Sequence, residues 1–405
     1  MNNTKKITFF LLLCSGFMSC IYWNPTLGGK IIKILMYICL IYIFCKKKQI
    51  SFFSSGISVC VLCFAFIPFL SIITAYLVHE QSFLHSCYGS QMHLMYLFYF
   101  LFHSYKINTK NILTSFFLLG VLWCLIEIIQ QISYPSFWFA TRMDNDEMEL
   151  EIRNGIYRYN VFGYQFGLIM LFYSFTQYLK NRKIVYLFGL ILGLVGIYLL
   201  ATRQIMFAAI LCLLYALYSR EKIKMSSLLI VIGCGFLIYK NFNQLFGEFV
   251  DMTKEIDEDY VRFLSYEFYG VEYNNGNLLQ ILLGNGDPVR DSKYQLEINS
   301  YEEEGLWRSD IGLVGLYSLY GFFYIITIIY FFIFCYRNRK YIDLYLKMYL
   351  VFMFSTSIML LHFGYGYGRI AITSFIFYLV DKSITYKKTK LKVYAPTSNN
   401  CNTCL

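Results

Sequence analysis

Long apolar runs separated by short polar connections make up most of this chain. A run of about 20 apolar residues crosses the hydrocarbon core of a bilayer, where a helix satisfies all of its own backbone hydrogen bonds. The pattern predicts about twelve such helices, at residues 7–22, 31–45, 57–78, 90–105, 112–133, 157–179, 184–201, 204–219, 226–240, 310–335, 342–362 and 367–381. The sequence therefore predicts an all-α polytopic membrane protein.

Two polar connections are much longer than the others. They cover residues 134–156 and 241–309, and the second one separates the ninth and tenth predicted helices. It is rich in Glu, Asp, Tyr and Asn, and Gly284 and Gly286 mark turns within it. We expect this loop to form short amphipathic helices over the bundle and to carry function, as long loops often do.

The composition agrees with a membrane-embedded chain. Of the 405 residues, 58% are hydrophobic and only 15% are charged, which excludes an ordinary soluble domain. No internal repeat divides the chain, so residues 1–405 are interpreted as one integral membrane domain. The first 20 residues resemble a signal peptide, but a second apolar run follows closely, and we expect the first helix to be retained.

Lysine and arginine residues gather at every second connection, and this sets the orientation. Membrane proteins keep Lys-rich and Arg-rich loops in the cytoplasm. With a cytoplasmic N-terminus, the inner side holds 22 of the 35 basic residues, including those of the tail at 382–405, and only three acidic residues. Both termini are therefore expected in the cytoplasm, and the loops 134–156 and 241–309 outside. The net charge of +10 is a topology signal and does not indicate nucleic-acid binding.

The cysteine positions do not suggest a disulfide framework or a metal site. Of the 13 cysteines only Cys87 falls on the predicted outer side, so no intramolecular disulfide can form there. Cys401 and Cys404 form a single CxxC pair in the tail, without the second ligand pair of a structural zinc site. We expect neither a metal nor a cofactor.

Five arginines mark the predicted outer face. A single arginine at a membrane boundary commonly reaches for water or pairs with a carboxylate. A gathered set favours a polyanionic ligand, because a guanidinium group binds phosphate through two parallel hydrogen bonds. At this depth the obvious polyanion is a lipid diphosphate. The five residues are Arg153, Arg158, Arg203, Arg308 and Arg369.

Four further side chains are candidates for the same site. Asp310 could orient Arg308 or accept a proton, or it could simply stabilise a helix N-terminus. His362 could act as a general base or pack as a core residue. Trp307 is suited to stacking on a sugar ring. Glu127 is the single carboxylate within a predicted span, either a buried base or a protonated core residue.

Three motifs follow one another along the chain in a characteristic order. The first is "RNGIYRYNVFGYQFGLIMLFYSF", in which arginines precede a span, and the second is "ATRQIMFAAIL". The third is the turn "LLGNGDP", followed by "RSDIGLVGLYSLYGFFY". Together with the large loop, this order resembles the O-antigen and capsule repeat-unit polymerases of the Wzy type, which are related to the O-antigen ligases. The likeness covers roughly residues 110–335 by motif and the whole chain by topology.

The resemblance implies an enzyme of the bacterial inner membrane that joins undecaprenyl-diphosphate-linked oligosaccharides at the outer face. An acceptor hydroxyl attacks the anomeric carbon and the lipid diphosphate leaves, without a metal. A flippase and a chain-length regulator are possible partners. In this interpretation Arg203, Arg308 and Asp310 are catalytic. The groups expected to bind substrate are Arg153, Arg158, Arg369, His362 and Trp307.

Three alternatives stay open. An O-antigen ligase resembles this architecture but carries a histidine in its large outer loop, and residues 241–309 contain none. A polysaccharide flippase or other transporter needs a polar path near the bilayer midplane, which the predicted spans do not show. A membrane scaffold without catalytic activity is the third alternative. The sugars, their linkage and the general base cannot be deduced from these residues.

Overall fold

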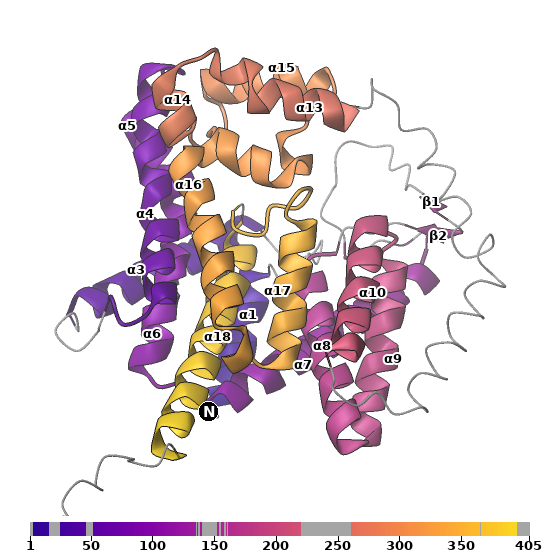
Figure 1. Cartoon of the computed structure of the whole chain (residues 1–405). Helices are drawn as coiled ribbons and strands as arrows, with labels where there is room; N and C mark the ends of the chain where they lie inside the picture. The colour runs from indigo at the N-terminus through magenta and orange to yellow at the C-terminus, as the bar shows by residue number, and fades with distance from the viewer. Residues whose placement is uncertain are drawn as a thin grey trace, which may run out of the picture.

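The computed structural model describes residues 3–15, 25–45, 52–134, 136, 138–139, 152–153, 155–157, 159, 161–219, 261–364 and 366–394. They form a helical bundle (Figure 1). The elements up to residue 218 are α1 (Asn3–Cys14), α3 (Pro25–Cys45), α4 (Gly56–Leu77), α5 (Phe83–Ser90), η2 (Gln91–Leu97), α6 (Phe98–Ser104), α7 (Thr109–Ile132), β1 (Ile152–Arg153), β2 (Ile156–Tyr157), α8 (Tyr164–Asn181), α9 (Ile184–Leu199) and α10 (Arg203–Tyr218). The later elements are α13 (Val261–Gly270), η3 (Glu272–Asn274), α14 (Leu278–Leu283), α15 (Lys293–Glu303), η4 (Arg308–Asp310), α16 (Gly312–Arg337), η5 (Arg339–Tyr341), α17 (Leu344–Thr356) and α18 (Tyr367–Tyr394).

Several helices are suited to a bilayer. Among the described residues, α4, α7 and α16 are long and apolar enough to cross a membrane, and shorter apolar helices include α9, α10 and α17. The fold is therefore compatible with an all-α membrane protein, whereas the number of spans remains a prediction. The expected span at 226–240 lies outside the described residues. Each of the other predicted segments overlaps a helix.

The segment before α8 departs from the sequence prediction. The predicted span began at residue 157, but β1 and β2 pair there as a short antiparallel hairpin with Arg153 opposite Ile156. Helix α8 begins only at Tyr164, after Gly163 with φ of 121°. The apolar and aromatic residues of the hairpin continue the pattern of the helix, so hydropathy alone does not separate the two.

The elements between residues 261 and 310 lie across one end of the bundle, and we call them the cap (Figure 1). Residues within the cap have their own small hydrophobic core, formed by Tyr269, Tyr273, Tyr294 and Ile298, to which Ile311 also contributes. Short helices therefore fill the described part of the long polar insert. Its position on the outer side of a membrane remains a prediction.

The cap is attached to the bundle through a break in helix α16. Gly321 has φ of 74° and ψ of −175°, which interrupts the helix. The amides of Asn285 and Gly286 donate to the freed carbonyls of Ser318 and Leu319, at 2.9 Å and 2.7 Å. A Cβ atom on Gly284 would lie 2.4 Å from the backbone of this break, so glycine is required there.

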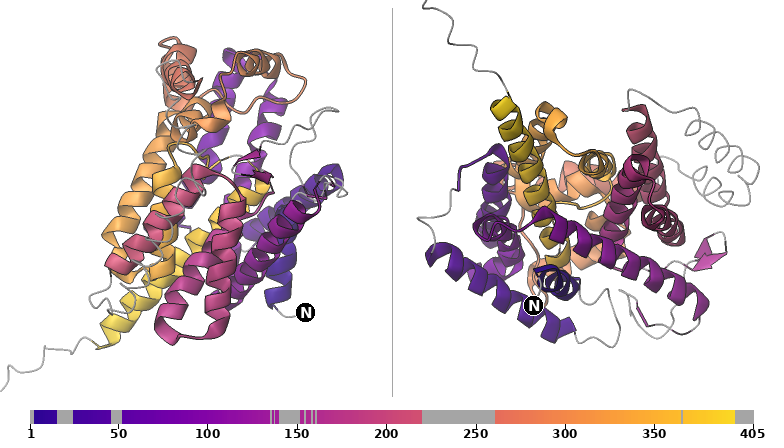
Figure 2. Two further views of the ribbon diagram at one scale, coloured as in Figure 1. Left: turned by 90° about the vertical axis from the view of Figure 1, so that its right-hand side faces the viewer. Right: turned by 90° about the horizontal axis from the view of Figure 1, so that it is seen from below.

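Helix α18 runs through the centre of the bundle (Figure 2). Every side chain from Ile370 to Val380 is buried. Helix α18 packs against α1, α4, α6, η2 and α17. The starts of α7 and α17 and the ends of α8 and α18 line one cavity at the end of the bundle opposite the cap. We call this the basic end, because Lys180 and Lys382 are among its residues.

Candidate functional site

The structure places three of the five predicted arginines. Arg203 is the first residue of α10 and is partly exposed. Arg308 lies in η4 and is buried, while Arg369 lies in the first turn of α18 and is partly exposed. Of Arg153 only the backbone position in β1 is described, and Arg158 lies outside the described residues.

Arg369 and His362 lie next to each other at the cap end of α17. The Nη1 group of Arg369 donates a hydrogen bond of 3.3 Å to the carbonyl of Leu361. His362 is buried, and its Nε2 atom lies 2.6 Å from the hydroxyl of Thr356, the last residue of α17. The charge of Arg369 also acts on Tyr164, at the start of α8. The region therefore joins α8, α17 and α18.

The same end of α17 also receives the elements that carry the other two arginines. Helix α10, which begins with Arg203, packs along α17. The amide of Leu313, five residues after Arg308, donates a 2.8 Å hydrogen bond to the carbonyl of Ser357. Helices α10 and α18, which bear Arg203 and Arg369, and the start of α16, which follows Arg308, thus all pack against α17.

Arg308 is engaged with groups of the cap itself. Only 5% of the residue is exposed, and Nη1 donates to the Tyr294 hydroxyl at 3.2 Å. The guanidinium carbon lies 5.8 Å from the centre of the Tyr269 ring. The guanidinium of Arg308 is therefore desolvated and surrounded by protein groups.

Asp287 is the buried carboxyl group that the charge of Arg308 influences. The Tyr320 hydroxyl donates to both of its oxygens, at 2.9 Å and 3.1 Å. Burial raises the pKa of Asp287 to about 6, although the hydrogen bond from Tyr320 and the charge of Arg308 act in the opposite direction. At neutral pH this group is therefore largely ionised, and it titrates within a mildly acidic range.

His79 connects the end of α4 to the cap. Its Nδ1 atom lies 3.2 Å from a carboxylate oxygen of Glu297, and its Nε2 atom lies 3.0 Å from the side-chain oxygen of Asn285. The ring stacks on Tyr294, with centroids 4.0 Å apart. We name the group of His79, Asn285, Asp287, Tyr294 and Arg308 the cap cluster.

The position of Asp310 changes the interpretation of this residue. It is exposed, and its carboxylate lies 3.8 Å from Arg262. Asp287 is buried and feels the charge of Arg308, whereas the cation beside Asp310 in an ion pair is Arg262. Trp307 is 36% exposed, which leaves part of its ring accessible.

Two buried polar side chains on neighbouring helices, Glu127 of α7 and Gln165 of α8, have no such network. Glu127 is 0% exposed and Gln165 is 2% exposed, and within the described part of the chain no side-chain oxygen or nitrogen of either has a hydrogen-bond partner. Trp123 of α7 packs against Gly163 and Gly167 at the start of α8. This contact fixes the position of α7 along the axis of α8. Glu127, one turn beyond Trp123 on α7, is thereby placed beside the start of α8.

Unpartnered buried polar atoms are rare, because each one loses its hydrogen bonds to water. Glu127 and Gln165, which we call the α7–α8 pair, therefore each mark a position where a ligand or water would supply the hydrogen bonds. Gln165 is adjacent to Tyr164, on which the charge of Arg369 acts. Gln165 thus lies on the helix whose first residue feels the charge of Arg369, whereas Glu127 lies on the neighbouring helix α7.

Sequence reasoning anticipated parts of these two regions and missed others. It singled out Glu127 as the lone carboxylate of a span, but not its lack of a partner. His79 and Asn285 were missed because the hydrogen bond between them joins positions 206 residues apart. Asp287 stands in the "GNGDP" turn, and that motif was the available signal for it.

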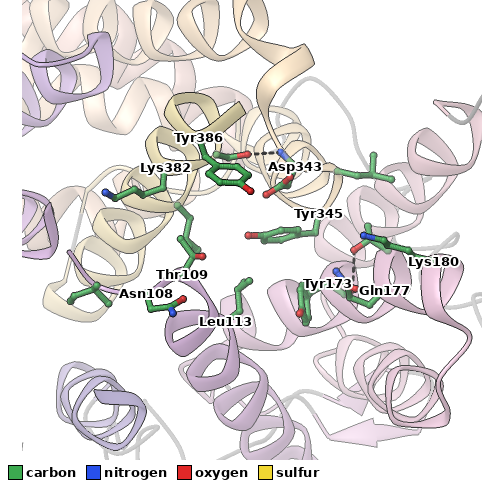
Figure 3. Close-up of a pocket in the computed structure, with 15 residues that line it drawn as sticks. Asn108, Thr109, Leu113, Tyr173, Gln177, Lys180, Asp343, Tyr345, Lys382 and Tyr386 are labelled. Carbon is green, nitrogen blue, oxygen red and sulfur yellow. Dashed lines mark hydrogen bonds between the residues drawn. The ribbon is translucent and has the colours of Figure 1, made fainter. Parts of the chain in front are cut away.

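A cavity of about 630 Å³ lies elsewhere, at the basic end (Figure 3). Its lining contains none of the eight residues predicted for the site. Among the described residues, no three His, Cys, Asp or Glu side chains are grouped as metal ligands would be.

Comparisons with known proteins do not add a family. No protein-family model matches the chain, and no curated protein matches it.

Proposed function

We propose that this protein is a metal-independent polymerase of undecaprenyl-diphosphate-linked oligosaccharide repeat units, which builds a surface polysaccharide such as O-antigen or capsule. The observation that carries the proposal is the packing of α10 and α18, which bear the partly exposed Arg203 and Arg369, against α17, beside helices with buried polar groups that lack partners among the described residues. Guanidinium groups suit a diphosphate, and the unpartnered polar groups suit sugar hydroxyls.

In this proposal the arginines stabilise the leaving group. Arg203 and Arg369 are partly exposed, so both can reach a lipid diphosphate that enters from the bilayer. As the glycosidic bond to the diphosphate breaks, negative charge grows on the phosphate oxygens. Fixed guanidinium groups interact more strongly with that charge than with the bound donor, and this lowers the barrier.

The proposed acceptor side uses the buried polar groups. The attacking hydroxyl must lose its proton, and Glu127 is a carboxyl group without a protein partner in the described structure. His362 is a weaker choice because its Nε2 atom already contacts Thr356. We therefore assign proton acceptance to Glu127 and a supporting role beside Arg369 to His362.

The other residues predicted for the site have less direct roles in this proposal. Arg308 holds the cap in place through Tyr294 and influences Asp287, instead of contacting the donor directly. Trp307 remains a candidate for sugar stacking. Arg153 and Arg158 precede α8 in sequence and remain candidates for a second phosphate contact. Asp310 has no assigned chemical role.

The proposal includes an orientation. The cap faces the outside of the bacterial inner membrane, and both termini face the cytoplasm, because basic residues dominate the connections at the opposite end. Cysteine labelling should report Arg182 as cytoplasmic and Tyr273 as external. A cytoplasmic position of residue 273 would contradict the whole assignment.

The direct test is reconstitution of the purified protein in proteoliposomes with lipid-linked repeat units. A polymerase extends them into a ladder of chain lengths and releases one undecaprenyl diphosphate for each bond formed. Glu127→Gln should reduce the rate at least a hundredfold while the protein keeps its size-exclusion profile. Unchanged repeat units with wild-type protein would contradict the proposal.

The same preparation separates the main alternatives. Movement of repeat units across the bilayer without a ladder would identify a flippase, a function that unpartnered Glu127 within a predicted span would also suit. Transfer of the glycan to added lipid A core, without extension of the repeat units, would identify a ligase.

A further inference from the structure

We propose that the cavity at the basic end binds the phosphate headgroup of an anionic phospholipid from the cytoplasmic leaflet. This inference rests on the orientation given with the proposed function, but none of its residues belongs to the proposed catalytic region. Beyond that orientation, it uses only the cavity and the charge distribution of the basic end.

The cavity has a volume of about 630 Å³, which is ample for a phospholipid headgroup. Both apolar and polar side chains line the cavity. Ile107, Leu113 and Leu379 supply apolar surface, while Lys180 and Thr109 supply polar groups. A lining of this kind fits an amphiphile, which brings a charged headgroup and the first carbons of its chains together.

Tyr345 indicates that a polar ligand belongs there. The residue is only 7% exposed, and its hydroxyl points into the cavity (Figure 3). Its ring packs edge-on against Tyr173, with centroids 5.4 Å apart, but its hydroxyl makes no hydrogen bond within the described part of the chain. A hydroxyl that opens into a cavity from an otherwise buried side chain is suited to donate to a phosphate oxygen.

Two helix N-termini meet at the same cavity. Helix α7 begins at Thr109 and helix α17 begins at Leu344, and both residues line the cavity. The N-cap of α17, Asp343, makes no side-chain hydrogen bond to the first turn, so amides of that turn remain available. Free amides and the positive end of the helix dipole favour a phosphate group.

The charges at the cavity favour an anion. Figure 3 shows Lys180 extending toward the cavity, with Lys382 at its edge. Neither lysine has a carboxylate partner among the described residues. The one carboxylate of the lining, Asp343, is paired with Lys387 at 2.7 Å. This leaves an excess of positive charge for a ligand.

The cytoplasmic leaflet supplies a ligand with these properties. Positive residues gather at this end in the pattern of cytoplasmic loops, and basic pockets between membrane helices on that side hold anionic headgroups. An anionic phospholipid therefore meets the requirements for charge, hydrogen bonding and apolar contact together.

Native mass spectrometry of the full-length protein tests the proposal, with phosphatidylglycerol and phosphatidylcholine of the same acyl chains as probes. The wild-type protein should retain phosphatidylglycerol preferentially. Lys180→Gln should weaken its binding about fivefold, since a lysine near an anionic lipid surface contributes on that scale. Tyr345→Phe should weaken it about tenfold, as expected for a hydrogen bond to a charged acceptor.

Two matched variants control for general surface charge and for changes in aromatic residues. Lys183→Gln removes an exposed lysine of the same connection outside the cavity, and Tyr336→Phe removes an exposed hydroxyl at the same end. Both should bind phosphatidylglycerol as the wild type does. Equal retention of the two lipids by the wild type would overturn the proposal. Equal weakening in all four variants, or none in Lys180→Gln and Tyr345→Phe, would overturn it as well.

Discussion

The cap cluster and the α7–α8 pair are both buried and polar, yet they differ in one respect. In the cap cluster, the side chains of His79, Asn285, Asp287 and Arg308 all have hydrogen-bond partners within the protein. Glu127 and Gln165 have none among the described residues. A satisfied network holds a fold together, whereas buried polar groups without partners require another explanation.

This difference changes the roles that the arginines take. Arg308 belongs to the satisfied region, so its loss should first affect stability. Arg203 and Arg369 reach the cap end of α17 while remaining partly exposed, so their loss should first affect ligand binding and catalysis. Each of the following substitutions tests one side of that contrast.

The largest effect on stability is expected from Arg308→Met. The substitution removes the hydrogen bond to Tyr294 and the positive charge that acts on buried Asp287. The loss of a buried charged partner should lower the free energy of unfolding by about 3 kcal/mol. Thermal unfolding in detergent measures this, with Arg262→Met on the cap surface as the control. If both variants unfold at the same temperature, the cap cluster does not stabilise the fold as described.

We expect the free energy of unfolding to depend on pH through Asp287, with an effect no larger than that of Arg308→Met. Burial raises its pKa to about 6 in the folded protein, from an ordinary value of 3.8, so the folded state binds the proton more tightly than the unfolded state. Its contribution to stability is therefore fully present below about pH 4 and is lost as the pH rises through 6. The change is on the order of 3 kcal/mol at most.

The Asp287→Asn variant isolates that contribution, because the amide oxygen can still accept from Tyr320. Between pH 4 and pH 7, the wild type should lose stability relative to the variant by on the order of 3 kcal/mol at most. Parallel stability curves over this range would show that the Asp287 carboxyl group is not desolvated in the folded protein.

The smallest effect is expected from Asp310→Asn. The residue is exposed and its nearest described cation, Arg262, is 3.8 Å away, so stability should change by less than about 0.5 kcal/mol. Polymer length should also stay near normal, since no chemical role is assigned to Asp310. A strong loss of polymer at normal protein abundance would restore Asp310 to the catalytic site.

The helices could be predicted far better than the site. Long apolar runs specify membrane-type helices directly, and segments such as 57–78 and 112–133 agree closely with α4 and α7. The break at Gly321 could not be predicted, because it depends on backbone contacts with the distant residues Leu282 and Gly284. The hairpin before α8 was missed because its apolar and aromatic residues continue the hydropathy pattern of the helix. The partners of Arg308 were likewise hidden, because Tyr294 and Asp287 approach it only after the cap folds.

Substitution of Arg203 tests the central claim most directly, because this arginine begins α10 at the proposed diphosphate site. Removing one charge-stabilising donor should cost on the order of 3 kcal/mol in the transition state, or roughly a hundredfold in rate. In the proteoliposome assay, Arg203→Ala should therefore leave mostly single repeat units. Arg203→Lys should restore the ladder only in part, because lysine keeps the charge but loses the planar pair of donors. Arg339→Ala, an exposed change at the opposite end, should give the normal ladder. Normal chain lengths from both Arg203 variants at normal abundance would contradict the account.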